Sequence, residues 1–182
     1  MKILDCEGPL QPRVVQSTEH SFGQFPASSV LILAEEDAHL ANGNGKRNYW
    51  LAENGKTTWQ GFIMRVDRRS SYMQICKRMI TGIQIKNTRN GEARTYGTDK
   101  FQVSGSENET GPWKTLVQDH LDDPTNSSGP IPLVNFTFEE PVQIQYLKFD
   151  LISYWGAGGG GLQYFAAIPA TSKYWQNNYI VL

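Results

Sequence analysis

Cysteine is scarce in this sequence, whose 182 residues include only Cys6 and Cys76. The two could pair, but two cysteines in a domain of this size do not make a disulfide scaffold. The sequence favours free thiols in a reducing compartment. A single domain of this length can bury a sizeable core without disulfides or metals.

Net charge and long apolar runs are also lacking. The formal net charge is −1, which argues against a nucleic-acid partner bound mainly through its phosphates, because such a partner requires a basic face. No apolar run reaches the length of a membrane span. The opening "MKILDCEGPL" has no apolar core of the kind that a signal peptide carries, so the sequence predicts a cytoplasmic or non-classically secreted protein.

The residue types that catalysis needs are not arranged in a catalytic pattern. The three histidines, His20, His39 and His120, are scattered and have no metal-ligand spacing. Ser104 has no G-x-S-x-G context. The acidic pairs, such as Asp122-Asp123, are adjacent in sequence, and neighbours on a strand point to opposite faces. The sequence therefore predicts a protein that is not an enzyme and requires no cofactor.

What the sequence does have is a succession of short strand patterns. Gly, Pro, Asn and Asp recur about every ten positions, which is typical of a sandwich or barrel. In "MITGIQIKN" (79–87), Ile83 and Ile85 alternate with polar residues, as in a half-buried strand. A longer segment, 133–154, predicts two strands with a break at Pro141. Similar patterns occur in "TDKFQVSGS" (98–106), "WKTLVQD" (113–119) and "LQYFAAI" (162–168).

These patterns predict an all-β fold, a sandwich or a barrel. The predicted domain spans 28–168. An irregular segment, 1–27, precedes it, and a C-terminal extension, 169–182, is expected to pack on the same domain. Large aromatic side chains are usually well buried. The tryptophans predicted to lie in the core are Trp50, Trp59 and Trp113.

The one low-complexity stretch is "GAGGGG", residues 156–161. A phosphate cradle would open a helix that carries Lys and Ser or Thr, whereas the strand-like "LQYF" follows here. A flexible linker is disfavoured because strand patterns resume at once on both sides. We expect a tight loop between two antiparallel strands, in which glycine supplies positive φ and leaves Tyr154 and Trp155 accessible.

Several segments, taken in order, resemble a known family. The succession of "NYWLAENG", "ITGIQIKN", "KFQVSGS" with "WKTL", and "IQYLKFDLISYWG" is similar to the coagulation factor V/VIII C-type domain, also called the discoidin domain. The resemblance covers 28–168. It implies an antiparallel β-sandwich, a galactose-binding-like jelly roll with two antiparallel sheets packed face to face. It also implies a binding module that uses loops at one end of the sandwich.

Two functions follow from this resemblance. The first is a lectin-like module that recognises a small carbohydrate. The alternative is an intracellular adaptor that docks a protein complex, or phospholipid head groups, through the same loops. Planar Arg and Asn groups suit sugar hydroxyls, and aromatic faces suit C–H patches, so the loop chemistry favours the lectin. The candidate ligand-binding residues are Arg47, Tyr49, Arg69, Tyr72, Arg89, Asn90, Arg94, Tyr154 and Trp155.

The resemblance also bears on calcium. Many sugar-binding members of the family hold a structural calcium near the loop before the Trp, with the help of an Asp. Here that loop reads "HLANGNGKRNYW", with Asn42 and Asn44 in place of acids. Asn oxygens and backbone carbonyls can ligate calcium, with lower affinity because they carry less charge. A calcium ion held by Asn42 and Asn44 is therefore expected to be structural and not required for binding.

Overall fold

In the computed structural model, the described part of the chain comprises residues 13–17, 50–51, 61–66, 68–69, 75–76, 78–88, 97–126, 129–156 and 159–170. The regular elements within it are all β-strands. None of these residues belongs to a helix long and apolar enough to cross a membrane.

Five antiparallel strands form one layer, which we call sheet A. Their order across the sheet is β1-β3-β11-β8-β9. The strands are β1 (Arg13–Ser17), β3 (Gly61–Arg65), β8 (Lys100–Ser106), β9 (Lys114–His120) and β11 (Tyr146–Leu151).

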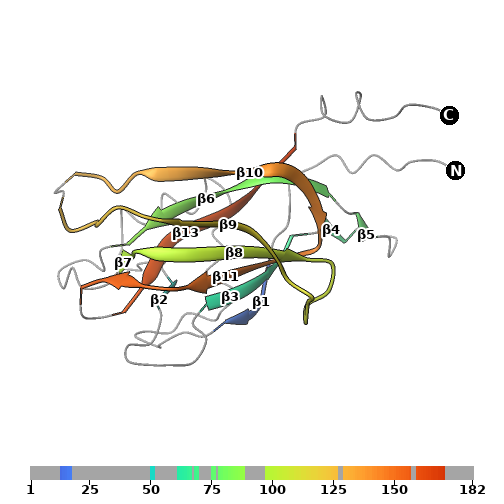
Figure 1. Ribbon diagram of the computed structural model, residues 1–182, viewed down its shortest axis with the longest axis horizontal. Coiled ribbons are helices and arrows are strands. Elements are labelled where there is room, and N and C mark those ends of the chain that lie inside the picture. Colours follow the sequence, from blue (N-terminus) through green and yellow to red (C-terminus); the bar gives the residue numbers. More distant parts are fainter. Residues whose placement is uncertain are drawn as a thin grey trace, which may run out of the picture.

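Four antiparallel strands form the second layer, sheet B, in the order β10-β6-β13-β2. They are β2 (Trp50–Leu51), β6 (Arg78–Asn87), β10 (Leu133–Ile144) and β13 (Gly161–Pro169). Two short pairs are the other strands among the described residues: β7 (Gly97–Thr98) with β12 (Tyr154–Trp155), and β4 (Arg68–Arg69) with β5 (Ile75–Cys76). Figure 1 shows the two sheets face to face, with β7 near one end of the sandwich and β4 and β5 beyond the other.

The core lies between the two sheets and follows from the alternation of side chains along each strand. In β8, Phe101 and Val103 are buried on the inner face, and in β6, Ile83 and Ile85 are buried opposite them. Successive side chains of a strand point to opposite faces, so one apolar set per strand is enough to fill the space between two sheets. The predicted all-β antiparallel sandwich is confirmed.

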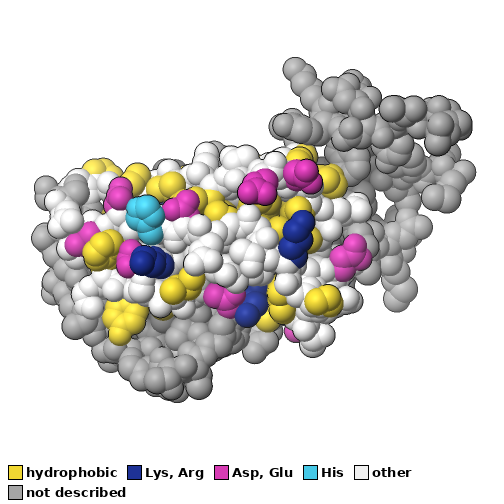
Figure 2. Space-filling view, in the orientation of Figure 1, with side chains coloured by type: hydrophobic (Ala, Val, Ile, Leu, Met, Phe, Trp, Pro, Cys, Tyr) yellow, Lys and Arg dark blue, Asp and Glu magenta, His cyan; other side chains and the backbone are white. Residues whose placement is uncertain are grey.

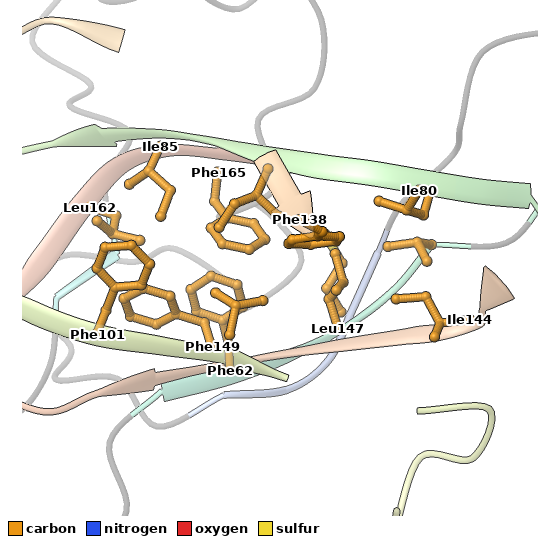
Figure 3. Close-up of a cluster of buried hydrophobic side chains, with 14 of the residues drawn as sticks. Phe62, Ile80, Ile85, Phe101, Phe138, Ile144, Leu147, Phe149, Leu162 and Phe165 are labelled. Carbon is orange, nitrogen blue, oxygen red and sulfur yellow. The ribbon is translucent and has the colours of Figure 1, made fainter. Parts of the chain in front are cut away.

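Phenylalanine rings fill the centre of this core (Figure 3). The Phe149 ring stacks on Phe62, with centroids 5.1 Å apart, and on Phe101, with centroids 5.8 Å apart. Phe165, from sheet B, meets both Phe62 and Phe149 edge to face. Offset stacking and edge-to-face contacts are the favourable arrangements of aromatic rings, so these contacts hold the two sheets together.

A bulge in the pairing of β6 with β10 allows β6 to bury isoleucines on both sides of the bulge. The pairing of β6 with β10 skips from Thr137–Gly82 to Val142–Ile80. The shift changes which alternate residues face inward, so Ile80 and Ile83 are both fully buried. A Cβ atom at Gly82 would collide with the carbonyl oxygen of Phe136, so only glycine fits there without displacement of the β10 backbone.

β10 corrects one prediction from the sequence. The break expected at Pro141 does not occur, because β10 runs without interruption over Leu133–Ile144, and the break falls at Gln145. Two features accommodate Pro141. β10 is an edge strand of sheet B, and Pro141 lies where the pairing of β10 with β6 is interrupted by a bulge. A proline therefore did not mark a strand end here.

Trp113 corrects a second prediction, since it is not a core residue. Its side chain is half-buried just before β9, and the Lys148 ammonium lies 6.0 Å from its ring centroid. Lys148 Nζ also lies 2.9 Å from Asp150 Oδ1. Trp113 is thus a platform for a cation. The predicted burial of Trp50 and Trp59 concerns side chains outside the described part of the structure. Nothing in the structure tests the predicted domain limits at 27/28 and 168/169.

Truncation of Phe149 tests the importance of the stacked rings. Phe149→Ala is expected to lower the free energy of unfolding by about 3–5 kcal/mol, because it removes the central ring and leaves a cavity. The matched control is Ile152→Ala, since Ile152 is 50% exposed and a surface truncation costs about 0.5 kcal/mol or less. Urea unfolding followed by tryptophan fluorescence measures both variants. Equal losses for the two variants would show that the ring contacts do not dominate the core.

Candidate functional site

Segments from both sheets meet at one end of the sandwich, which we call the loop end. β6 ends there at Asn87, which pairs with Leu162 of β13. In sheet A, the Lys100–His120 pair lies at the same end. The β7–β12 pair is added beyond these strands (Figure 1). The loop end is therefore built from parts of the chain that are far apart in sequence.

Thr98 joins β7 to sheet B. Its backbone N–H donates to Asn87 Oδ1 at 2.8 Å, and its carbonyl oxygen accepts from Asn87 Nδ2 at 2.8 Å. Its hydroxyl donates to the carbonyl of Gly161 at 2.9 Å. Thr98 and Asn87 are both buried, and buried polar groups require such partners. β7 is consequently fixed to β6 and β13 at once.

Trp155 joins β12 to the segment that follows β9. Its Nε1–H donates to the carbonyl oxygen of Leu121 at 2.9 Å. The ring of Pro124 covers the backbone of β7, because a Cβ atom at Gly97 would lie only 2.7 Å from Pro124 Cγ. The indole of Trp155 is half-buried, so its polar edge serves the architecture of the loop end.

Ser153 and Asp99 join β11 to β8. The Ser153 hydroxyl donates to Asp99 Oδ2 at 2.8 Å and accepts from the backbone N–H of Lys100 at 3.2 Å. The backbone N–H of Asp99 donates to the Ser153 carbonyl at 2.9 Å, and the Asp99 carbonyl accepts from the N–H of Leu121 at 2.8 Å. The Ser153 hydroxyl therefore bridges the Asp99 carboxylate and the backbone at the start of β8.

The surface of the loop end mixes apolar and charged groups (Figure 2). Tyr154 is 38% exposed, and Ile152 is more exposed still. His120 Nδ1 lies 3.1 Å from Asp119 Oδ1, and both side chains face solvent. The side chain of Asp122 is also exposed. An exposed aromatic ring with polar groups at the same end can stack on one face of a ligand, while the polar groups form hydrogen bonds with the edges of the ligand.

The glycine run 156–161 has the predicted backbone conformation but not the predicted setting. Gly156 and Gly159 have positive φ angles, 79° and 114°, which confirms the need for glycine there. The run does not close a hairpin, however, because β12 pairs with β7 while β13 pairs with β6 and β2. The expected pairing of the two flanking strands with each other is wrong. The run instead crosses from the β7–β12 pair to sheet B.

Two of the candidate ligand-binding residues, Tyr154 and Trp155, lie at the loop end. Arg69 lies in β4, which follows the far end of β3, and Figure 1 places the β4–β5 pair beyond the opposite end of the sandwich. The structure therefore does not bring Arg69 together with Tyr154. The other candidates lie outside the described residues: Arg47, Tyr49, Tyr72, Arg89, Asn90, Arg94, and the calcium candidates Asn42 and Asn44.

The described residues next to two of these candidate segments lie at the loop end. Thr88 and Gly97, which flank the segment 89–96, both lie at the loop end, and the Thr88 carbonyl oxygen is 3.4 Å from the Cβ position of Gly97. Trp50, which follows the segment 42–49, pairs with Leu162 at the same end. Both segments thus have at least one end anchored where Tyr154 lies.

Sequence reasoning missed Asn87 and Thr98, which organise the loop end. A signal existed in the alternation of β6, because Ile83, Ile85 and Asn87 share one face. An Asn in line with two core isoleucines is directed inward, and a buried amide needs partners for its donors and acceptor. Its partners lie on β7 and beyond β9, and the sequence does not reveal these contacts.

The described residues contain no group of three or more His, Cys, Asp or Glu side chains arranged to hold a metal ion. The side chains of Asn87, Thr98 and Ser153 are instead bonded to neighbouring backbone or to Asp99. The arrangement presents an exposed aromatic ring, Tyr154, and exposed polar side chains at the same end.

Comparison with known proteins concerns the fold. No protein-family model matches the sequence, and no curated protein matches it either. Among solved structures the chain is similar to CBM32-1, a module from a family 31 glycoside hydrolase of Clostridium perfringens. The TM-score is 0.55 at 10% identity, over 87% of this chain and 93% of that chain.

Two further solved structures are similar. One is CpGH89CBM32-5, also from Clostridium perfringens, in complex with GalNAc-β-1,3-galactose, with a TM-score of 0.55 at 12% identity over 87% of this chain and 94% of that chain. The other is allantoicase, with a TM-score of 0.54 at 12% identity over 86% of this chain and 40% of that chain. The predicted galactose-binding-like β-sandwich is confirmed as the fold.

Removal of the Trp155 hydrogen bond tests the architecture of the loop end. Trp155→Phe keeps an aromatic ring but leaves the Leu121 carbonyl without this donor, so the free energy of unfolding should fall by about 0.5–1.5 kcal/mol beyond the effect of the smaller ring. The matched control is Trp113→Phe, which makes the same change at the opposite end and leaves a ring beneath Lys148. Urea unfolding compares the two. If Trp155→Phe is no more destabilising than Trp113→Phe, the bond does not hold the loop end.

Proposed function

We propose that this protein is a non-catalytic carbohydrate-binding module, lectin-like in its action, that takes a small sugar at the loop end. The observation that carries the proposal is Tyr154, an aromatic ring 38% exposed on a strand pair that hydrogen bonds anchor to the sandwich. Its fold is that of modules whose names and ligands concern carbohydrates.

Tyr154 supplies the apolar half of sugar recognition. One face of a pyranose presents C–H groups, which pack on an aromatic ring, while its edges present hydroxyls that need planar donors and acceptors. Asp122 and Lys100 are exposed polar groups at the same end. The mixture of one apolar platform with several polar partners matches this requirement better than it matches a purely apolar ligand.

The rigidity of the loop end favours binding. Thr98, Trp155 and Ser153 each bond to a different neighbouring segment. A backbone held in this way loses little conformational freedom when a ligand binds, which leaves more of the contact energy as affinity.

The remaining contacts are assigned to the segments that adjoin the loop end. We propose that Arg89 or Arg94 donates paired hydrogen bonds to vicinal hydroxyls, because a guanidinium fits two oxygens at once. Asn90 would donate to and accept from a third hydroxyl. Arg47 and Tyr49 belong to the segment that leads into Trp50 at the same end. A calcium ion on Asn42 and Asn44 would stabilise that segment without contacting the sugar.

Hydrogen bonds at the loop end, and not only the similarity to solved structures, support binding without catalysis. A fold of this kind also occurs in allantoicase, and fold alone does not determine function. At the loop end, the Ser153 hydroxyl donates to Asp99, and Asp119 faces His120. The Ser153 oxygen also accepts from the backbone N–H of Lys100, so we assign both pairs a structural role.

A glycan array tests the proposed function. We expect at least one mono- or oligosaccharide to bind with a dissociation constant below about 1 mM, which corresponds to roughly −4 kcal/mol. The array is probed with and without excess chelator, and the same sugar should bind in both conditions because no cofactor is required. An array without any bound glycan would contradict the proposal and favour the adaptor, which docks a protein complex or phospholipid head groups through the same loops.

Substitution of Tyr154 tests where the sugar lies. Tyr154→Ala should weaken binding of the best array glycan by about 5- to 30-fold, because it removes an aromatic contact and its buried area. The melting temperature of each variant is measured as the control for folding. The control is Trp113→Ala, an aromatic truncation at the opposite end, which should leave affinity unchanged. If Trp113→Ala weakens binding and Tyr154→Ala does not, the sugar binds at the other end of the sandwich.

A further inference from the structure

We propose that Asn87 is the positioning residue of the ligand-binding end: its buried amide holds the β7–β12 pair in place and so sets the affinity of the Tyr154 platform without touching the ligand. This inference rests on the proposed function for its consequence, but its structural half can be tested in the ligand-free protein. It assigns a role to a residue that belongs to neither the candidate contact residues nor the apolar core.

The Asn87 amide forms hydrogen bonds with β7, with the segment after β9 and with its own neighbour Thr88. Nδ2 donates to the carbonyl of Thr98 at 2.8 Å and to the carbonyl of Asp122 at 3.3 Å. Oδ1 accepts from the N–H of Thr98 at 2.8 Å and from the N–H of Thr88 at 3.0 Å. The side chain is only 4% exposed. Water therefore cannot replace these partners easily if the amide is lost.

The amide acts as a substitute for a neighbouring strand. β6 ends at Asn87, yet β7 lies beside it and would otherwise have an unpaired N–H and carbonyl at Thr98. A primary amide offers one acceptor and two donors in a plane, so it can bond both groups of one residue as a strand would. β7 is thus paired on one side by β12 and on the other by a side chain.

The position of Tyr154 follows from this arrangement. Tyr154 pairs directly with Thr98 across the β7–β12 ladder, and Trp155 pairs with Gly97. The indole of Trp155 bonds the Leu121 carbonyl, and Asn87 bonds the next carbonyl, that of Asp122. Asn87 therefore holds both the strand that supports Tyr154 and the segment against which Trp155 rests.

Only a residue with both a donor and an acceptor can fill this position. Asp at residue 87 would keep the acceptor for the two N–H groups but would turn a negative charge toward the carbonyls of Thr98 and Asp122. The cost of that repulsion falls on the β7–β12 pair and the segment after β9. The stacked phenylalanine core is made of other residues, so it should be affected much less.

The experiment uses Asn87→Asp and a matched control, Asn135→Asp, which makes the same change at an exposed position of β10. Amide hydrogen exchange is measured by NMR in the full chain without ligand. In Asn87→Asp, the N–H groups of Thr98, Asp99 and Leu121 should exchange about tenfold faster or more, in line with the loss of one or two hydrogen bonds. The N–H groups of Val103 and Ile85, in the core strands, should change much less, and Asn135→Asp should change neither set.

A purely structural role would give a different pattern. If exchange accelerates equally in the core strands and at the loop end, Asn87 stabilises the whole fold and the inference is overturned. It is overturned as well if the exchange of Thr98 is unchanged. Asn87→Ala, which removes the four bonds without burying a charge, is the second variant, and failure of both variants to fold would show a global role and contradict the inference.

The link to ligand binding is measured separately. Wild type and variants are titrated with methyl β-galactoside and with GalNAc-β-1,3-galactose, and Asn87→Asp should bind about tenfold more weakly while Asn135→Asp binds as wild type does. Unchanged affinity in Asn87→Asp, beside wild-type binding, would overturn the inference. If the wild type binds neither sugar nor any array glycan, the proposed function fails, and the exchange pattern alone decides whether Asn87 positions the β7–β12 pair.

Discussion

The packing of phenylalanine rings between the two sheets is the interaction on which the rest of the structure depends. Phe149 stacks on Phe62 and Phe101 within sheet A and meets Phe165 of sheet B edge to face. Neither sheet could remain in water with its apolar face uncovered, and burial of such faces is the dominant favourable term in folding. The rings set the separation of the sheets and hence the distance that the segments at either end must span.

At the loop end, apolar packing gives way to hydrogen bonding, and the transition occurs within a single strand. β6 directs Ile83 and Ile85 into the core, and the next residue on that face is Asn87. Beyond the last rung of a sheet, backbone groups have no strand to pair with, yet the loops that cover the core bury them. An inward-facing amide satisfies such groups on β7 and after β9. The end of the sandwich is therefore sealed by polar contacts that are specific in geometry, whereas the core tolerates any well-packed apolar set.

This division explains how one fold can serve different functions. The sandwich is shared with sugar-binding modules and with allantoicase, and its core specifies no ligand. The side chains that the end segments present can change without altering such a core, and an exposed ring such as Tyr154 keeps a defined position only if the backbone beneath it is fixed. Ser153, Thr98 and Trp155 supply that fixation from three directions.

The sequence by itself determined the fold class and the inner faces of the strands, because alternation is a local property: Ile83, Ile85, Phe101 and Val103 face inward wherever the strands pair. It also determined that the glycine run needs positive φ, since that too is local. Only the tertiary structure decided which strands pair across the run, that β10 continues through Pro141 at a sheet edge, and that Arg69 lies away from Tyr154. It alone revealed the partners of Asn87, because a buried amide is satisfied by whichever backbone the fold brings to it, and that backbone comes from residues 11 and 35 positions further along the chain.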